Sequence, residues 1–336
     1  MTGGTVGELG ELGLIARIKA RLPESAPGIL VGPGDDAAVM ERRRGEELAI
    51  TTDALVDGVH FDRSFVPLDA VGYRALAVNL SDIAAMGGFA KYALVSLALP
   101  GQTEVEAIVA LYQGMLALAR RFEVAIVGGN MSQAPLLVIN ITVLGSTKGR
   151  DKNILTRSAA KPGEQVAVTG YLGAAAAGLA VLRQHLPLES KAAASLKQAF
   201  LQPYPRVAEG QVLVEHGVRA AIDISDGLIS DLSHLCKASQ VGARIEIDRL
   251  PIPPAVRANF GDRALELALS GGDDYELLFT ASAEVIDRVK AAASCPITVI
   301  GEIMPDKAGE ITLIDGKGNP VNLPKAGWEH FTAKRS

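Results

Sequence analysis

Acidic residues interrupt the apolar segments of this chain at four places, and this recurrence constrains its fold more than any other feature. The residues are Asp35 and Asp36, Asp82, Asp223 with Asp226, and Asp273 with Asp274. A single Gly-Asp-Asp turn is commonly a solvated loop. Carboxylates from several such turns would repel one another in a shared cluster unless cations neutralised them. The pattern therefore predicts a fold that gathers these turns around metal ions.

Residues 31–61 combine two short apolar runs with oxygen ligands. The runs, 37–40 and 48–50, are predicted to be strands that pair as a hairpin. Asp36 stands just before the first strand, and the second strand ends on Thr51, Thr52 and Asp53. Carboxylates and hydroxyls at strand ends, with no sulfur nearby, suit hard cations such as Mg²⁺.

The length and composition indicate a two-domain α/β (α+β) protein. The chain has 336 residues, of which 48% are hydrophobic and only 4% aromatic, so its cores are predicted to consist mainly of Ala, Val and Leu. Helices are expected at 69–86 and 104–121, and a short strand at 124–127 is expected to end in Gly128-Gly129-Asn130. The charged segment STKGRDKN predicts a boundary between domains 1–148 and 149–336.

The charge balance argues against partners that attract basic proteins. A net charge of −5 lacks the basic footprint of a nucleic-acid binder and disfavours an anionic membrane surface. No apolar run approaches the roughly 20 residues of a membrane span, and no signal-peptide pattern is present. Cys236 and Cys295 match no metal-ligand spacing, so reduced thiols in a soluble, cytoplasmic protein are expected.

Common nucleotide-binding motifs do not explain the sequence. Residues 32–37 match the dinucleotide fingerprint formally, but a strand rather than a helix is predicted to follow them. The phosphate-binding motif G-x-x-x-x-G-K-[ST] is absent. His60 is either structural or functional, and Trp328 either anchors the C-terminal tail or stacks on a ligand. Arg157 would be a phosphate clamp if it faced the metals.

The family resemblance comes from segments read together. The chain contains, in this order, GDDAAV, ITTD…GVHF, AVNLSDIAAMGG, VGGN, LTRSAAKPGE, IDISDGLISDL and SGGDDYELLFT. Together they resemble the thiamine-monophosphate kinases, a family within the superfamily named for aminoimidazole ribonucleotide synthetase. GVHF and SDGLISDL point to this family rather than to its relatives.

This resemblance implies a fold and an activity. The fold would be the two-domain aminoimidazole ribonucleotide synthetase-like fold, with the N-terminal domain binding ATP and Mg²⁺ and pairing in a homodimer. The active site would lie between the two domains, with substrate residues on the C-terminal α/β domain. The reaction would be direct in-line transfer from ATP to thiamine monophosphate with several Mg²⁺ ions, giving thiamine diphosphate in the last step of its biosynthesis.

The resemblance also implies roles for individual residues. The Mg²⁺ ligands would be Asp36, Thr51, Thr52, Asp53, Asp82, Asn130, Asp223 and Asp226. The contacts to ATP would come from Gly129, Asn130, Arg157 and Ser225. The thiamine phosphate site would contain His60, Asp273 and Trp328. Among these residues, Asp53, Asp226 and Arg157 would carry the transfer itself.

Two positions depart from the family pattern. The family often has Asp where this chain has Asn130, and Glu where it has Asp273. An Asn offers Mg²⁺ a carbonyl oxygen without charge, so one ion would be held more weakly. Asp273 is shorter by one methylene than Glu, which puts its direct contact to substrate in doubt.

Two alternative functions stay open at this stage. Another ATP-using enzyme of the superfamily, such as an amidine-forming cyclo-ligase, would also need acidic metal sites. A selenophosphate-type synthetase is disfavoured because no reactive cysteine lies near the N-terminus. A non-catalytic protein that binds nucleotide or divalent cations could also keep this fold, and ATP binding without product would identify it.

Overall fold

The computed structural model describes residues 47–147, 154–305 and 308–322, together with shorter stretches before them, 29–31 and 39–40, and with Thr5, Leu14, Arg17, Ile18, Ala20 and Arg21. The chain forms two compact units. Unit 1 comprises Met1–Ile83 and Phe89–Asp151, and unit 2 comprises Ala84–Gly88 and Lys152–Ser336. Among the helices of the described residues, none combines the length and apolarity needed to cross a membrane.

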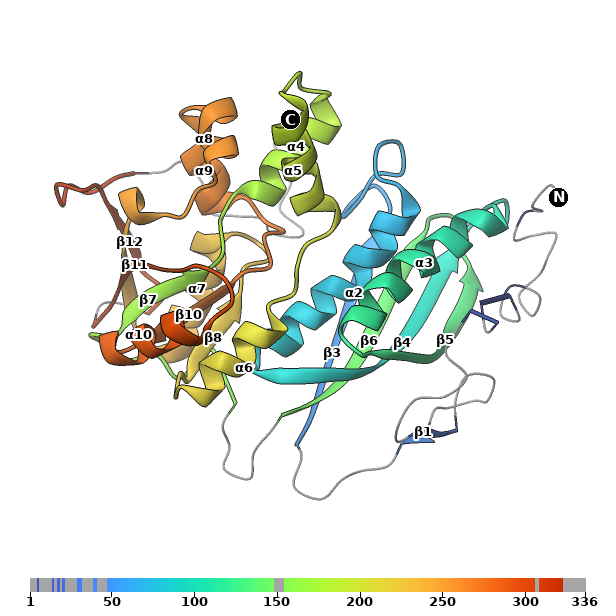
Figure 1. Ribbon diagram of the computed structural model, residues 1–336, viewed down its shortest axis with the longest axis horizontal. Coiled ribbons are helices and arrows are strands. Elements are labelled where there is room, and N and C mark those ends of the chain that lie inside the picture. Colours follow the sequence, from blue (N-terminus) through green and yellow to red (C-terminus); the bar gives the residue numbers. More distant parts are fainter. Residues whose placement is uncertain are drawn as a thin grey trace. The chain divides into compact units, whose positions relative to one another are not determined.

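Unit 1 is built on a four-stranded sheet (Figure 1). Its strands are β3 (Glu47–Val56), β4 (Gly88–Leu99), β5 (Ala125–Gln133) and β6 (Val138–Thr147). Their order in the sheet is β3-β6-β4-β5, with β3 antiparallel to β6 and β4 parallel to β5. Strands β3 and β5 therefore form opposite edges of this sheet.

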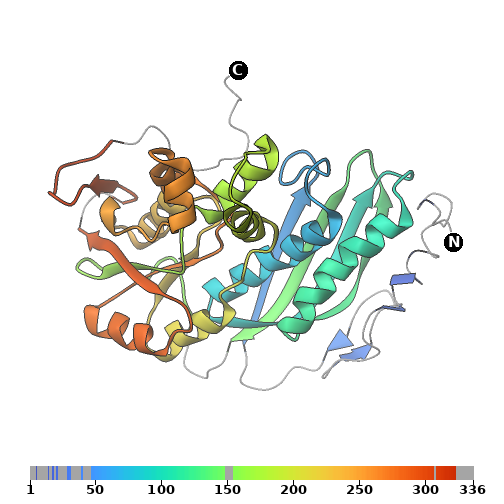
Figure 2. The ribbon, with the colours of Figure 1, turned by 45° about the horizontal axis from the view of Figure 1, so that its top comes forward.

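Two helices, α2 (Leu68–Ala85) and α3 (Val105–Arg121), lie side by side over one face of this sheet (Figures 1 and 2). The burial of β4 alternates along its length, as expected for a sheet that packs on one face only. Apolar side chains from both layers form the core, and they include Leu76, Leu80, Val95, Leu97, Leu111, Met115 and Ile141. Each fully buried Leu or Ile contributes roughly 1.5–3 kcal/mol to folding.

The two helices approach so closely that glycine is required at the contact. A Cβ at Gly114 of α3 would collide with the backbone carbonyl of Asp69 in α2, and a Cβ at Gly72 would collide with the carbonyl of Leu111. This close approach fixes the position of α2 over the sheet.

Unit 2 is built on a six-stranded sheet with the order β12-β9-β11-β7-β10-β8. These strands are β7 (Gln165–Thr169), β8 (Ala220–Asp223), β9 (Gly242–Glu246), β10 (Leu277–Ala281), β11 (Ile297–Met304) and β12 (Ile311–Ile314). All neighbouring pairs are antiparallel except β12 and β9. The helices are α4 (Ala174–Gln184), α5 (Ser190–Leu201), α6 (Val207–Glu215), α7 (Leu228–Ser239), α8 (Pro254–Phe260), α9 (Arg263–Ser270) and α10 (Ala283–Ala292), with a 3₁₀ turn at Ile247–Arg249.

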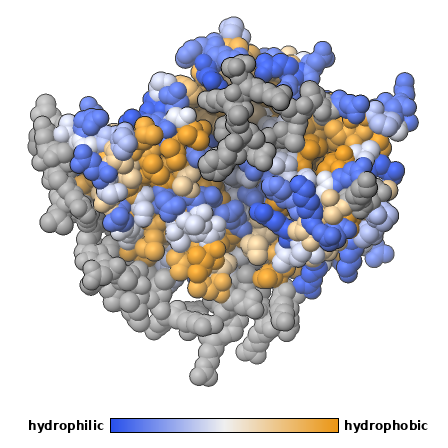
Figure 3. All heavy atoms as spheres, turned by 180° about the vertical axis from the view of Figure 1, so that it is seen from behind, coloured by the Kyte–Doolittle hydropathy of each residue, from blue (hydrophilic) through white to orange (hydrophobic). Residues whose placement is uncertain are grey.

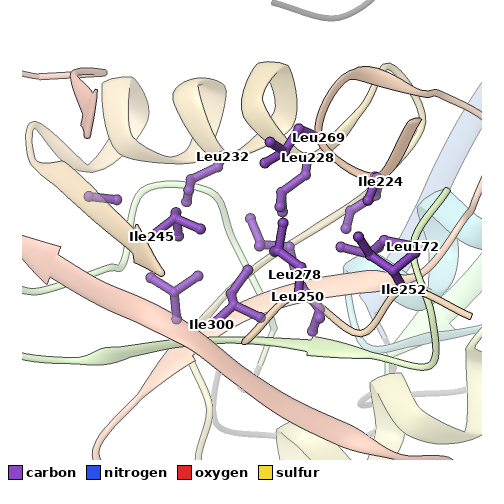
Figure 4. Packing of buried hydrophobic residues seen from close by; sticks show 14 of the residues in the cluster. Leu172, Ile224, Leu228, Leu232, Ile245, Leu250, Ile252, Leu269, Leu278 and Ile300 are labelled. Carbon is purple, nitrogen blue, oxygen red and sulfur yellow. The ribbon is translucent and has the colours of Figure 1, made fainter. Parts of the chain in front are cut away.

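Both faces of this second sheet are buried. Val166 and Val168 of β7 join one cluster with residues of α4, α7 and α9, part of which is shown in Figure 4. Ala167, between them, joins a second cluster with residues of α6 and α10. Burial on both faces explains why β8 and β10 are apolar along almost their whole length instead of alternating.

The structure confirms the α/β fold class and corrects several details. The predicted hairpin is wrong, because β2 (Val39–Met40) pairs with β1 (Ile29–Val31), whereas β3 pairs with β6. Thr51, Thr52 and Asp53 lie within β3 rather than at its end, and β5 continues through Gly128-Gly129-Asn130 to Gln133. The sequence patterns of α8 and β12 were too short to predict these elements.

Gly114→Ala should destabilise the protein by about 1–3 kcal/mol or more, because the added methyl group forces α3 away from α2. Urea unfolding measures the change. Gly101→Ala is the matched control, since its Cβ would lie 3.8 Å from the nearest atom, in the Gln133 side chain. Equal stability of the two variants would show that the helices can separate without cost.

Candidate active site

The first group of acidic and hydroxyl side chains lies on the inner face of β3. Successive side chains of a strand point to opposite faces, and burial along β3 follows this rule: Thr51, Asp53 and Leu55 are less exposed than Thr52 and Ala54. Asp82 comes to the same place from α2, and the Thr51 hydroxyl donates a hydrogen bond of 2.5 Å to Asp82 Oδ2.

Asp53 and Asp82 form a repelling carboxyl pair. Burial is the main cause that raises the pKa of Asp53 to about 6, and the charge of Asp82 and a hydrogen bond between the two carboxyls raise it further. Two carboxyls that share a proton near neutral pH are stabilised as anions only when a cation lies beside them. All the donors at this place are oxygen atoms, which fits a hard cation such as Mg²⁺.

Thr52 points away from this pair. Its hydroxyl lies 3.3 Å from Asn140 Oδ1 and 3.1 Å from the Thr142 hydroxyl, both on β6. The alternation of β3 therefore does not bring the Thr52 side chain to Asp53 and Asp82.

His60 follows β3 in a turn. The backbone N–H of Val56 donates a 3.0 Å hydrogen bond to His60 Nδ1, so the proton of the neutral imidazole is on Nε2. Asp57 and Arg63 close the same turn with an ion pair of 2.6 Å. His60 therefore has a structural role through Nδ1, which holds the backbone of Val56.

Gly129 and Asn130 lie on β5, at the other edge of the sheet. Only glycine fits at 129, because a Cβ there would collide with the carbonyl oxygen of Val95 on β4. The neighbouring Asn130 is exposed. Unit 1 by itself therefore keeps Asn130 apart from Asp53 and Asp82.

The second acidic group lies in unit 2, where β8 ends at Asp223 and the loop Ser225-Asp226-Gly227 leads into α7. Asp231, in the first turn of α7, accepts hydrogen bonds from the backbone N–H groups of all three loop residues, at 3.0, 3.0 and 3.1 Å. Burial raises the pKa of Asp231 to about 7, and the charges of Asp223 and Asp226 add to the rise.

The Gly271–Tyr275 loop contacts this acidic loop directly. The N–H of Asp273 donates to the carbonyl of Ser225 at 2.9 Å, and the N–H of Tyr275 donates to the carbonyl of Ile224 at 2.8 Å. Asp273 has a φ of 70°, a conformation that Asp tolerates better than most residues. Its Oδ1 accepts a 3.0 Å hydrogen bond from the Tyr275 hydroxyl.

Two further carboxylates fix the ends of this loop. Asp274 accepts N–H bonds from Gly173 and Ala175 at the start of α4, at 2.6 and 3.1 Å. Burial raises the pKa of Asp274 to about 7, although these two bonds oppose the rise. Glu276 binds Arg206 through two hydrogen bonds, of 2.6 and 2.7 Å.

The remaining predicted site residues divide into two groups. Arg157 is exposed, and its carbonyl accepts a 2.7 Å hydrogen bond from the Ser239 hydroxyl. Asp36 and Trp328 lie outside the described residues. Within the part of the chain that the structure describes, no group of three or more His, Cys, Asp or Glu side chains could hold a metal ion. The described candidates are instead two carboxylates in each unit.

Comparison with known proteins identifies the family. The model "AIR synthase related protein, N-terminal domain" matches residues 34–147, and the corresponding C-terminal domain model matches residues 161–314. The thiamine-monophosphate kinase of Salmonella typhimurium is 40% identical over 328 residues, which are 96% of this chain and 98% of the relative. The chain belongs to the thiamine-monophosphate kinase family.

Solved structures of this family have the same fold. The thiamine-monophosphate kinase of Stenotrophomonas maltophilia gives a TM-score of 0.80 at 38% identity, covering 89% of this chain and 95% of that chain. The structure described as "AaThiL complexed with AMPPCP and TMP" gives a TM-score of 0.75 at 32% identity, covering 98% of this chain and 100% of that chain. These matches confirm the resemblance and the two-domain fold class.

Three residues that anchor the loops, Asp231, Arg206 and Glu276, were not predicted from the sequence. Asp274 was predicted, but as one of the acidic residues around metal ions rather than as an anchor. Two of these anchors, Asp231 and Asp274, accept hydrogen bonds from backbone N–H groups. The other two, Arg206 and Glu276, bind each other. Asp231 and Asp274 are the second Asp in the segments SDGLISDL and GGDD, and this second acidic residue was the available signal. Periodicity alone could not separate an anchoring carboxylate from a ligand.

In the metal-free protein, Asp53→Asn should be more favourable for stability at neutral pH than at acidic pH, when each variant is compared with the parent at the same pH. The folded pKa of Asp53 lies above its ordinary value, so its stabilising contribution is full below pH 3.8 and is lost as pH rises through about 6. Because Asn is neutral throughout, the unfolding free energy of the variant minus that of the parent should increase from pH 4 to pH 7.

Urea unfolding with a chelator present measures this difference, and Asp287→Asn, at an exposed position on α10, is the matched control. A difference that does not change with pH would mean that the pKa of Asp53 is not raised in the folded protein.

Proposed function

We propose that this protein transfers the γ-phosphoryl group of ATP to the phosphate of thiamine monophosphate and so makes thiamine diphosphate, the last step in the biosynthesis of this cofactor. The observation that carries the proposal is the similarity to thiamine-monophosphate kinases over nearly the whole chain, including a structure described as bound to AMPPCP and TMP. The acidic residues of both units supply the chemistry that such a transfer needs.

Residues of both units would hold the metal ions. Asp53, Asp82 and the Thr51 hydroxyl are the described candidates in unit 1, where the raised pKa of Asp53 supports a cation at this place. Asp223 and Asp226 are the candidates in unit 2, and Asp36 completes the predicted set. Bound Mg²⁺ would shield the negative charges of the two phosphates and help to align them.

The acceptor explains why the site needs no general base. The second pKa of a phosphate monoester is about 6, so the attacking oxygen is already ionised near pH 7. The residues of the chain therefore have to bind, orient and exclude water rather than remove a proton. Direct in-line transfer follows, with Arg157 as the proposed clamp on the transferred phosphoryl group.

The remaining assignments complete the proposal. Gly129, Asn130, Arg157 and Ser225 would contact ATP, whereas His60, Asp273 and Trp328 would contact thiamine phosphate. His60 would do so as a neutral donor through Nε2, since Nδ1 already accepts the N–H of Val56. The cationic thiazolium would suit the face of Trp328. Domain 1–148 would bind ATP and Mg²⁺, and domain 149–336 would carry substrate residues. The enzyme would work in the cytoplasm, where ATP is available.

The decisive experiment incubates the purified protein with ATP, Mg²⁺ and thiamine monophosphate, with free thiamine as a parallel acceptor, and follows thiamine diphosphate by chromatography. Product should form from the monophosphate only. Asp53→Asn should lower kcat at least about 100-fold, because one charged metal ligand is lost. ATP binding with no product from either acceptor would favour another reaction of the superfamily or a binding role.

We also propose that the protein is a homodimer joined through unit 1. The outer face of β3 exposes Leu48 and Ile50, at 63% and 61%, and apolar side chains reach the surface on the face seen in Figure 3. Apolar side chains that line one sheet face suit a second copy.

The edges of the sheet support the same proposal. Asp53 and Asn130 lie on its two opposite edges, about 14 Å apart at a strand spacing of about 4.8 Å, whereas Mg²⁺ lies about 2.1 Å from its ligands. Within one sheet these two residues cannot hold the same ion, so a metal site that contained both would need Asn130 from a second copy.

Ile50→Glu should convert the dimer to a monomer, because the new charge would be buried without a partner at the interface. Light scattering after size-exclusion chromatography measures the mass. Ala117→Glu, at an exposed position of α3, is the control and should stay dimeric. A dimeric Ile50→Glu variant would exclude this face as the interface.

A further inference from the structure

Asp231 is a buried carboxylate that the proposed reaction does not use. Its side chain is only 2% exposed, and one of its oxygens, Oδ2, accepts three consecutive backbone N–H bonds from Ser225, Asp226 and Gly227. The chain can present three N–H groups to one atom because Gly227 has a φ of 119°, which L side chains rarely adopt.

The three bonds define what this carboxylate can do. An oxygen that already accepts three N–H bonds has little capacity left to bind a metal ion or a phosphate donor. Bonds from N–H groups to a charged acceptor are also stronger than bonds between neutral groups. Through Oδ2, Asp231 therefore acts on the loop backbone rather than on a ligand.

The loop held in this way carries the proposed metal ligands of unit 2. Asp226 is the central residue of the loop. Asp223 is the last residue of β8, two positions before the loop begins at Ser225. Both carboxylates lie close enough to Asp231 to repel it.

The opposite side of the loop is fixed to the segment that carries Asp273. Ser225 accepts the N–H of Asp273 at 2.9 Å, and a Cβ at Gly272 would lie 2.5 Å from the Ser225 carbonyl oxygen. A shift of the Ser225–Gly227 loop would therefore displace Asp273. The metal ligands and the proposed substrate contact of unit 2 depend on the same backbone.

We propose that Asp231 is a positioning residue: its three backbone hydrogen bonds hold the Ser225-Asp226-Gly227 loop, and with it Asp226 and Asp273, in the geometry that phosphoryl transfer requires. This inference rests on the proposed function. Partners that orient metal ligands typically contribute 10- to 100-fold to metal affinity or activity, so an effect of about this size is expected.

The test compares Asp231→Ala, which removes the acceptor, with Asp231→Asn, which keeps an acceptor oxygen without its charge. Asp315→Asn is the matched control, since Asp315 also accepts backbone N–H bonds, from Lys317 and Asn319, in a turn at the end of β12. Three properties are measured: amide hydrogen exchange of residues 225–227 in the metal-free protein, the thermal unfolding temperature, and kcat and KM for both substrates.

In Asp231→Ala the three amides should exchange faster, and kcat should fall about 10- to 100-fold. Both effects should be smaller in Asp231→Asn. The Asp315→Asn control should match the parent. If Asp231→Ala does not fold, Asp231→Asn gives the same comparison with a smaller effect. Faster exchange with unchanged kcat and KM would overturn the proposal, as would unchanged exchange.

A loss of activity that simply follows a lower unfolding temperature, with no change in exchange confined to residues 225–227, would also overturn it. A parent protein that makes no thiamine diphosphate would instead overturn the proposed function. The amide exchange would then still decide whether Asp231 holds the loop.

Discussion

Repulsion between carboxylates is the constraint on which the proposed site depends. Asp53 and Asp82 are close enough to share a proton, and Asp231 lies beside Asp223 and Asp226. Such groups separate unless the surrounding structure holds them. In unit 1 the glycine contacts between α2 and α3 fix the helix that carries Asp82, and in unit 2 backbone hydrogen bonds fix the loop that carries Asp226. The packing thus keeps negative charge where a cation can neutralise it.

The same residue type does two different tasks in this protein. Asp231 and Asp274 accept backbone N–H bonds at the starts of α7 and α4, and Glu276 pairs with Arg206. Asp53 instead contacts another carboxyl, that of Asp82. The partners of a carboxylate, rather than its position in a motif, therefore distinguish an anchor from a candidate ligand.

The two sheets differ in how many of their faces are buried. The sheet of unit 2 has an apolar cluster on each face, so Ala167 faces one cluster and its neighbours Val166 and Val168 face the other. The sheet of unit 1 is covered by α2 and α3 on one face, and the other face of β3 exposes Leu48 and Ile50. Because of this difference, the exposed face of β3 in unit 1 is the surface proposed to bind a second copy.

The sequence by itself determined the fold class, most of the elements and the family, because long periodic helices and motifs in a fixed order are local properties. Helices α2 and α3 begin and end within one residue of the ranges that their patterns predict. Local patterns could not decide strand pairing, so the hairpin was wrong and Thr52 was grouped with Asp53, from which the alternation of β3 separates it. Nor could they show that Asp231 holds the loop of Asp226, or that Asn130 and Asp53 lie on opposite edges of one sheet. Only the tertiary structure decided these points, because each depends on which distant segments hydrogen-bond to each other.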